Sequence, residues 1–223
     1  MKLQLESPLK IKLVINQYFG QNATSLYAKE GLPGHNGIDF GATHGMPVYS
    51  PINGRAYFEI DQGGGHGVVI VSDDFYDYEN TQSQYKVILW HFCDSLKEPQ
   101  YRSPIQDFVF GKQVKVGDLV GYADNTGAST GDHLHFGLKP VMKGEDPNTW
   151  TNILQNNGYA GAIDPFPFFD PALNLPPITP QHVPTVYTPS IPSPVIVNGQ
   201  ITNWKQRWYW LLHSMGLDNW IPK

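Results

Sequence analysis

Between residues 45 and 138 the chain alternates short β-rich runs with glycine-containing turns, and this pattern most constrains its fold. The runs are MPVYSP, GRAYFEI, HGVVIVS, YKVILWHF, QVKVGDLVGYA and HLHFGLKP. Apolar residues recur at every second position, as at Val68 and Ile70, which is typical of strands with one buried face. The turns draw on 22 glycines and 19 prolines in 223 residues. We therefore predict a mainly β domain built on an antiparallel sheet.

Three further segments complete this domain. Residues 11–20 are predicted to form a first strand that ends in a turn. The polar segments 73–84 and 94–111 are predicted to be loops between strands, and loops of this length usually shape a binding surface or are disordered. We expect both to wall a substrate groove over the sheet.

The composition changes after about residue 165, with ten prolines between Pro165 and Pro194. A segment so rich in proline stays extended and cannot hold a ladder of backbone hydrogen bonds. We therefore predict a domain over 1–170, a proline-rich linker or arm over 171–200, and an amphipathic C-terminal helix over 201–223. In that last segment Trp204, Trp208 and Leu211 fall at helical spacing.

Charge and cysteine content exclude several classes of protein. A net charge of −5 and a pI of about 5.8 provide no basic footprint for nucleic acid or an anionic membrane. The one cysteine, Cys93, rules out an internal disulfide framework and a cysteine-rich zinc site. No apolar run suits a signal peptide or a membrane span. We expect synthesis as a soluble protein in the cytoplasm.

The stretch STGDHLHFGL, residues 129–138, contains two histidines separated by one leucine. On a strand His133 and His135 would point to one face, about 7 Å apart, and Leu134 would point into the core. One or both imidazoles could reach a single metal ion, and the spacing alone does not decide between these cases.

Two more segments offer metal-binding side chains. In GHNGIDF, His35 and Asp39 are four residues apart, so a locally extended chain would present both on one side. In YKVILWHF, His91 ends an apolar strand run. A carboxylate with imidazoles is a zinc-type ligand set. Cys93 is predicted to be a small buried apolar residue. The remaining histidines are expected to have ordinary structural roles: His44, His66, His182 and His213.

Together these motifs resemble the LytM/lysostaphin-type zinc endopeptidases of the M23 family. The matching stretches are GHNGIDF, HGMPVYSPINGRA, GGGHGVVI, LWHF, VKVGDLVGYADNTG and STGDHLHF, in the family's order over residues 34–138. Two positions depart from the family's pattern. Asp132 stands where the family usually has proline, and Gly137 stands where glutamate commonly follows HLHF. Neither is a metal-ligand position, so we expect these departures to tune the groove or a pKa.

The resemblance implies a role for each of five residues. His35, Asp39 and His135 would bind one Zn²⁺ per chain, which would lower the pKa of a coordinated water towards about 7. His91 and His133 would lie beside that water. One would take its proton as general base and the other would stabilise the oxyanion. The implied substrate is the peptide stem or cross-bridge of bacterial peptidoglycan.

Two other functions remain open at this point. One is a non-catalytic module that binds the cell wall through the same fold, although such modules typically lose ligands. The other is a zinc lyase or hydratase in which both His133 and His135 bind the metal. The proline-rich and tryptophan-rich segments suggest a phage lysin, either released from the host cell or carried in the virion. In the virion the tail would bind a protein partner.

Overall fold

The computed structural model describes residues 2–21, 26–29, 31–79, 81–142, 151–154 and 157–176. The chain divides into two units, Met1–Pro189 and Ser190–Lys223, and all described residues belong to the first. The predicted helix over 201–223 and most of the predicted linker lie outside the described residues. Within the part described, no helix is long and apolar enough to cross a membrane.

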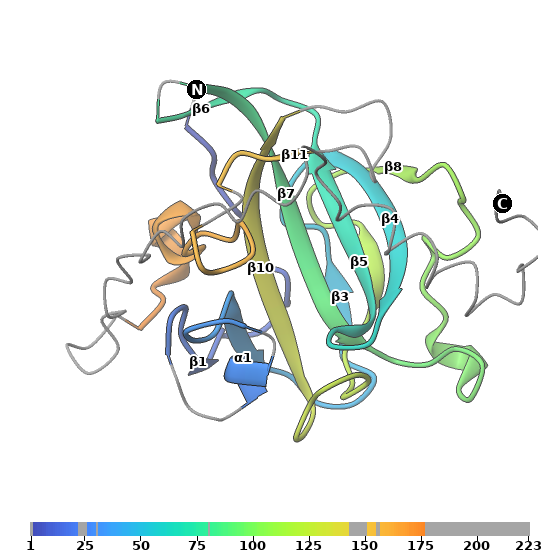
Figure 1. Cartoon of the computed structure of the whole chain (residues 1–223). Helices are drawn as coiled ribbons and strands as arrows, with labels where there is room; N and C mark the ends of the chain where they lie inside the picture. Colours follow the sequence, from blue (N-terminus) through green and yellow to red (C-terminus); the bar gives the residue numbers. More distant parts are fainter. Residues whose placement is uncertain are drawn as a thin grey trace, which may run out of the picture. The chain divides into compact units, whose positions relative to one another are not determined.

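The described residues form a mainly antiparallel β structure with very little helix (Figure 1). The strands are β1 (Ile15–Gln17), β2 (Ile38–Gly41), β3 (Pro47–Tyr49), β4 (Gly54–Asp61), β5 (Gly65–Ser72), β6 (Tyr76–Tyr78), β7 (Thr81–Phe92), β8 (Lys112–Val114), β9 (Leu119–Tyr122), β10 (His133–Met142) and β11 (Thr151–Asn152). The helical pieces are α1 (Leu26–Lys29) and the 3-10 turns η1 (Pro99–Tyr101), η2 (Phe166–Phe168) and η3 (Pro171–Leu173). The predicted fold class is confirmed.

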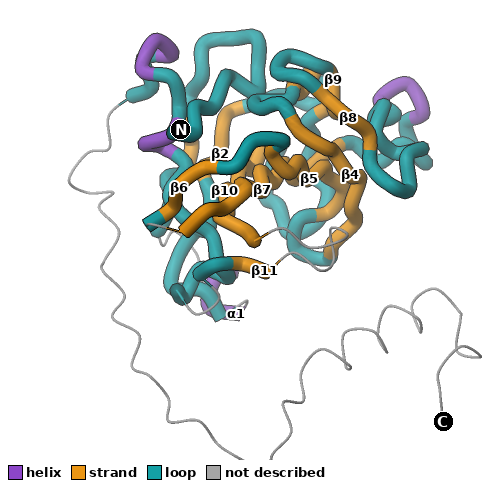
Figure 2. Tube along the Cα trace, turned by 90° about the horizontal axis from the view of Figure 1, so that it is seen from above, coloured by secondary structure: helices purple, strands orange, loops and turns teal. Residues whose placement is uncertain are grey.

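Among the described strands, one sheet has the order β1-β2-β10-β7-β5-β4-β8, with β11 paired to β10 and β6 paired to β7. Strands β3 and β9 form a separate pair. The view from above shows β2, β10, β7, β5 and β4 side by side (Figure 2). The run QVKVGDLVGYA therefore splits, because β8 extends the large sheet and β9 belongs to the small one.

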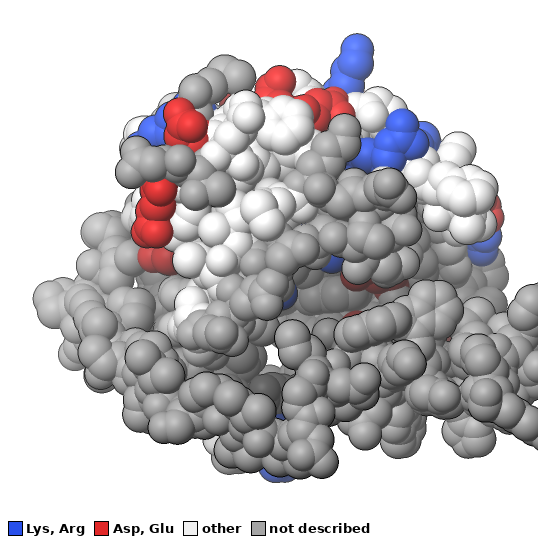
Figure 3. All heavy atoms as spheres, turned by 45° about the horizontal axis from the view of Figure 1, so that its top comes forward, with Lys and Arg blue, Asp and Glu red and all other residues white. Residues whose placement is uncertain are grey.

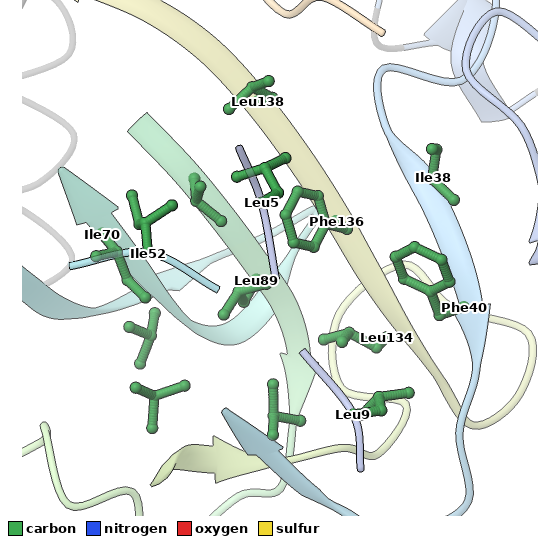
Figure 4. Close-up of a cluster of buried hydrophobic side chains, with 14 of the residues drawn as sticks. Leu5, Leu9, Ile38, Phe40, Ile52, Ile70, Leu89, Leu134, Phe136 and Leu138 are labelled. Atoms are coloured by element: carbon green, nitrogen blue, oxygen red, sulfur yellow. The ribbon is translucent and has the colours of Figure 1, made fainter. Parts of the chain in front are cut away.

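The core lies on one face of the large sheet and is filled by the period-two positions of its strands. Phe40, Leu134 and Phe136 are fully buried there, together with Leu89 (Figure 4). The segment before β1 also contributes, since Leu5 is fully buried, accepts a hydrogen bond from Asp170 N and donates one to Phe168 O. Because side chains alternate along a strand, packing Leu134 and Phe136 inward turns His135, which lies between them, to the opposite face.

The prediction that residues 73–84 form a loop beside the site is wrong. Tyr76–Tyr78 pairs with residues 81–83, so the segment is a β-hairpin at the beginning of β7. His91 lies near the other end of β7, eight residues beyond Ser83 and thus about 26 Å along the strand at 3.3 Å per residue. Of the two segments, only 94–111 begins next to His91, because it follows the C-terminal end of β7 (Figure 1).

Residues 171–176 belong to the first unit and pack on the rest of it, although the sequence assigns them to the linker. Leu173 and Leu175 pack against the core, and the Tyr18 hydroxyl donates a hydrogen bond to the carbonyl of Pro176.

Acidic and basic side chains are interspersed on the face drawn in Figure 3. The domain boundaries and the groove remain predictions.

Candidate metal and catalytic site

The three predicted metal ligands lie together. Asp39 of β2 and His135 of β10 are direct cross-strand partners, so their side chains share one face of the sheet. Asp39 Oδ1 is 3.1 Å from His135 Nδ1 and 3.0 Å from His35 Nε2, and the two imidazole nitrogens are 2.9 Å apart. All three side chains are buried. Within the described residues they form a group whose ligand atoms could hold one metal ion.

The turn that carries His35 is fixed by the segment after β1. The His35 carbonyl accepts a hydrogen bond from Gly20 N at 2.7 Å, and its amide donates to the Gln21 carbonyl at 3.1 Å. The ring nitrogen Nδ1 lies 3.3 Å from the Tyr18 carbonyl, which can only accept a hydrogen bond. Nδ1 can donate a hydrogen bond to this carbonyl, and Nε2 is the ring nitrogen that faces Asp39.

Gly37 allows the His35 turn to approach β10 closely. A Cβ at this position would lie 2.5 Å from the Phe136 carbonyl oxygen and 2.7 Å from the His135 ring. Both distances are shorter than real Cβ contacts allow. The glycine of H-x-G-x-D is therefore required by the close packing of the turn against the ligand strand.

His91 reaches the site because β7 bulges beside it. His66 and Gly67 of β5 pair with Phe92 and Trp90, which leaves His91 as the extra residue between them. Its φ of 67° lies in the left-handed region. A bulge re-aims a side chain relative to simple strand alternation. Here the His91 ring lies 4.5 Å from the His133 ring and 6.1 Å from the His135 ring.

The left-handed backbone at His91 leads to a stability prediction. We expect His91→Gly to be more stable than His91→Ala by about 1 kcal/mol, because glycine adopts positive φ without the steric cost that any Cβ incurs. Urea unfolding of the two variants measures the difference. At exposed Gln113 on β8 the order should reverse, since glycine weakens an ordinary strand position. Equal stability of the two His91 variants would contradict the strained conformation.

His133 lies on the more exposed side of the same cluster. Its Nδ1 is 2.8 Å from the Gly131 carbonyl, so Nδ1 carries the proton and Nε2 is free. That Nε2 lies 3.6 Å from Asp39 Oδ2. His91 has the same arrangement, because its Nδ1 donates to the Thr126 carbonyl at 2.7 Å. In the neutral form of either ring, Nε2 is therefore the nitrogen without a proton.

Burial and hydrogen bonding shift the ionisation of the buried groups. Burial by itself would raise the pKa of Asp39, but the hydrogen bonds with His135 and His35 hold that pKa far below its usual range. Burial lowers the pKa of His91 to about 4, against the raising effect of its hydrogen bond to Thr126. Burial likewise lowers the pKa of His135. An anionic carboxylate beside neutral imidazoles is the state in which these groups bind metals.

The group of converging ligand atoms includes His135 and leaves out His133, within the part of the chain that the structure describes. This grouping favours one metal ligand from the HLH motif over two. One carboxylate with two imidazoles suits zinc, and three protein ligands leave a position for water or substrate. The residues present therefore fit a metal ion of this type. Their individual roles remain predictions.

Two residues around the site, Tyr27 and Thr126, were not singled out from the sequence. The Tyr27 ring of α1 lies 5.6 Å from the His35 ring, and burial, followed by the charge of Asp39, raises the pKa of Tyr27 to about 12. The Thr126 carbonyl fixes the His91 ring. Asp132, one of the two departures from the family's pattern, accepts a hydrogen bond from His44 N. A backbone carbonyl or a nearby phenol has no sequence spacing that reveals it.

Comparisons with known proteins agree with this architecture. The chain is similar to the antimicrobial peptidase lysostaphin from Staphylococcus simulans, with a TM-score of 0.51 and 20% identity over 84% of this chain and 61% of that one. It is 29% identical over 102 residues, 46% of its length, to an uncharacterized metalloprotease of Haemophilus influenzae. It is also 29% identical over 156 residues, 69% of its length, to one of Buchnera aphidicola. No protein-family model matches the chain.

The alignments cover 18% of the Haemophilus protein and 36% of the Buchnera protein, so the chain spans much less than the length of these relatives. The comparison with lysostaphin shows the fold. The chain has the LytM/lysostaphin peptidase fold, and the resemblance found in its sequence is confirmed at that level.

Proposed function

We propose that this protein is a zinc-dependent endopeptidase that hydrolyses peptide stems or cross-bridges of bacterial peptidoglycan. The observation that carries the proposal is the convergence of His35, Asp39 and His135 beside two imidazoles with free nitrogens. Two relatives named metalloproteases and the fold of an antimicrobial peptidase support it. We assign the metal to those three ligands and the catalytic roles to His91 and His133.

The chemistry divides between the metal and the protein. Zinc, when bound, supplies a Lewis acid that polarises a peptide carbonyl and makes water more acidic. The free Nε2 of one imidazole accepts a proton from the attacking water and returns it to the leaving amine. The other imidazole, in its protonated form, donates Nε2–H to the carbonyl oxygen on which negative charge develops. The Gly131 and Thr126 carbonyls contact Nδ1 of the two rings, which leaves Nε2 of each ring for these roles.

The binding-module alternative lacks such support. A wall-binding scaffold needs no free imidazole nitrogens beside a metal site, yet His91 occupies a strained backbone conformation that aims it there. Strain of this kind clusters at functional sites. The lyase alternative requires His133 as a ligand, and the grouping of ligand atoms does not favour it.

The proposal is tested on purified sacculi of two cross-link chemotypes, by mass spectrometry of the released fragments. The zinc-loaded protein should release fragments with new amino termini, which identify the bond that is cleaved. Removal of zinc with a chelator should reduce release to background, and added zinc should restore it. Equal release by the metal-free protein, or wall binding without any new amine, would rule the proposal out.

We further propose that the residues beyond 176 attach the protein to a partner, as in a virion-associated phage lysin. The support is the tryptophan-rich sequence after the proline-rich segment. A chain ending at residue 176 retains the described contacts of Leu173 and Leu175, so it should cleave isolated sacculi like the full chain but no longer associate with virions. Loss of cleavage together with loss of folding would show that the removed residues support the domain.

A further inference from the structure

A second cluster of metal-binding side chains lies beside the candidate active site and shares no residue with it. The ligand atoms of four side chains lie within 4.8 Å of one another, among the residues that the structure describes: His44, Cys93, Glu98 and Asp124. They come from four separate places in the chain, namely the β2–β3 connection, the residue after β7, the segment before η1, and the β9–β10 connection. Tertiary folding alone brings these donors together.

His44 holds the centre of this cluster. Its Nδ1 lies 2.9 Å from Asp124 Oδ1, and its Nε2 lies 3.0 Å from Glu98 Oε1. The backbone amide of His44 donates to Asp132, and the ring packs edge-on against Tyr101 at 5.2 Å. The imidazole is thus fixed on several sides while it faces two carboxylates. A metal-bound histidine usually donates its other ring N–H to such a carboxylate. Either nitrogen of His44 could make this hydrogen bond while the other binds the ion.

Cys93 supplies the donor that distinguishes this cluster from an ordinary surface ion pair. It is the one cysteine of the chain, it is 4% exposed, and its thiol contacts the Ala123 carbonyl at 3.3 Å. Burial raises the pKa of this thiol to about 11, and the charges of Asp124 and Glu98 also raise it. A divalent cation reverses that balance, because a coordinating thiol loses its proton.

We propose that His44, Cys93, Glu98 and Asp124 form a second binding site for a zinc-type divalent cation. One sulfur, one imidazole nitrogen and two carboxylate oxygens are ligands that zinc accepts. Four protein ligands close a tetrahedral site, so this ion is structural rather than catalytic. The side chains of His44 and Glu98 are 39% and 33% exposed, which leaves the ion a path from solvent. Binding releases the thiol proton to solvent.

Such an ion would stabilise the positions of His91 and His133 through the backbone of Asp124. The Asp124 amide donates to the His91 carbonyl at 2.7 Å, and the His133 amide donates to the Asp124 carbonyl at 3.2 Å. Holding the Asp124 side chain in place therefore also holds the Asp124 backbone, which is hydrogen-bonded to both His91 and His133. It also ties the segment 94–111 to the sheet through Glu98.

The test measures metal content and the spectrum of the cobalt-substituted full-length protein. After removal of free metal, the wild type should retain two zinc ions per chain and His135→Ala should retain one. The Co²⁺ form should show a thiolate-to-cobalt charge-transfer band, because only the second site contains sulfur. That band should persist in His135→Ala and disappear in Cys93→Ser, which should itself retain one ion. The two sites are therefore tested separately, whatever the outcome for peptide cleavage.

Glu98→Gln provides a milder variant if Cys93→Ser fails to fold, and it should weaken binding of the second ion at least tenfold. Asp107→Asn is the matched control, since it removes a carboxylate of the same segment that pairs with Arg102 outside the cluster. It should retain both ions. One ion per wild-type chain, absence of the charge-transfer band, or a band that survives Cys93→Ser would overturn the second site.

Discussion

His135→Ala should lose the active-site metal ion and peptide cleavage together, whereas His133→Ala should keep that ion and lose turnover. His135 contacts both Asp39 and His35, so its removal opens the ligand set. His133 contributes a free nitrogen beside that set, and loss of a general acid–base group lowers kcat by about 10²- to 10⁴-fold. Metal analysis and cleavage rates on the same preparations separate the two effects.

His66→Ala is a suitable control, because this histidine lies on β5 outside both groups of metal-binding residues. It should retain the active-site ion and its cleavage rate within a few fold. The reverse pattern, with the metal lost in His133→Ala and kept in His135→Ala, would exchange the roles of the two HLH histidines. Loss of the active-site metal in both variants would instead support the lyase-type coordination, in which both histidines bind it.

Gly37→Ala should destabilise the fold by about 1 to 3 kcal/mol, the usual cost of overpacking a well-packed region. The new methyl group would meet the Phe136 carbonyl and the His135 ring, so the His35 turn must move away from β10. Displacement of one ligand relative to the others should also weaken metal binding by about 10- to 100-fold, as changes around metal ligands do. Thermal unfolding and competition with a zinc chelator measure the two effects.

Gly41→Ala, at the end of the strand that follows Gly37, provides the comparison. A Cβ there lies 3.4 Å from Asn16 Oδ1, an ordinary contact, so stability and metal affinity should change little. If Gly37→Ala behaves in the same way, the close approach of the turn to β10 is not what holds His35 in place.

Local periodicity predicts much of this fold, because each strand places its alternate residues without reference to the rest of the chain. On β10, Leu134 is buried in the core as expected, and His133 and His135 reach the same cluster. The cross-strand pairing of Asp39 with His135 could not be derived from spacing alone. The motif resemblance supplied that proximity.

Features that depend on partner strands were not predictable. The bulge at His91 exists only through its register against β5. The sequence of residues 73–84 resembles a loop because its many polar residues obscure the apolar alternation of Tyr76 and Tyr78, both of which pack on the core. His44 was expected to be ordinary, since its carboxylate partners lie 54 and 80 residues away.

The bridge between Leu5 and Phe169 has a consequence for biosynthesis. A nascent chain emerges amino terminus first, so Leu5 leaves the ribosome long before the residues that pair with it. Until residue 170 is available, the apolar side of the growing sheet lacks its final cover and the intermediate is prone to aggregation. Maturation of this β domain therefore waits until nearly the whole of its own length has been translated.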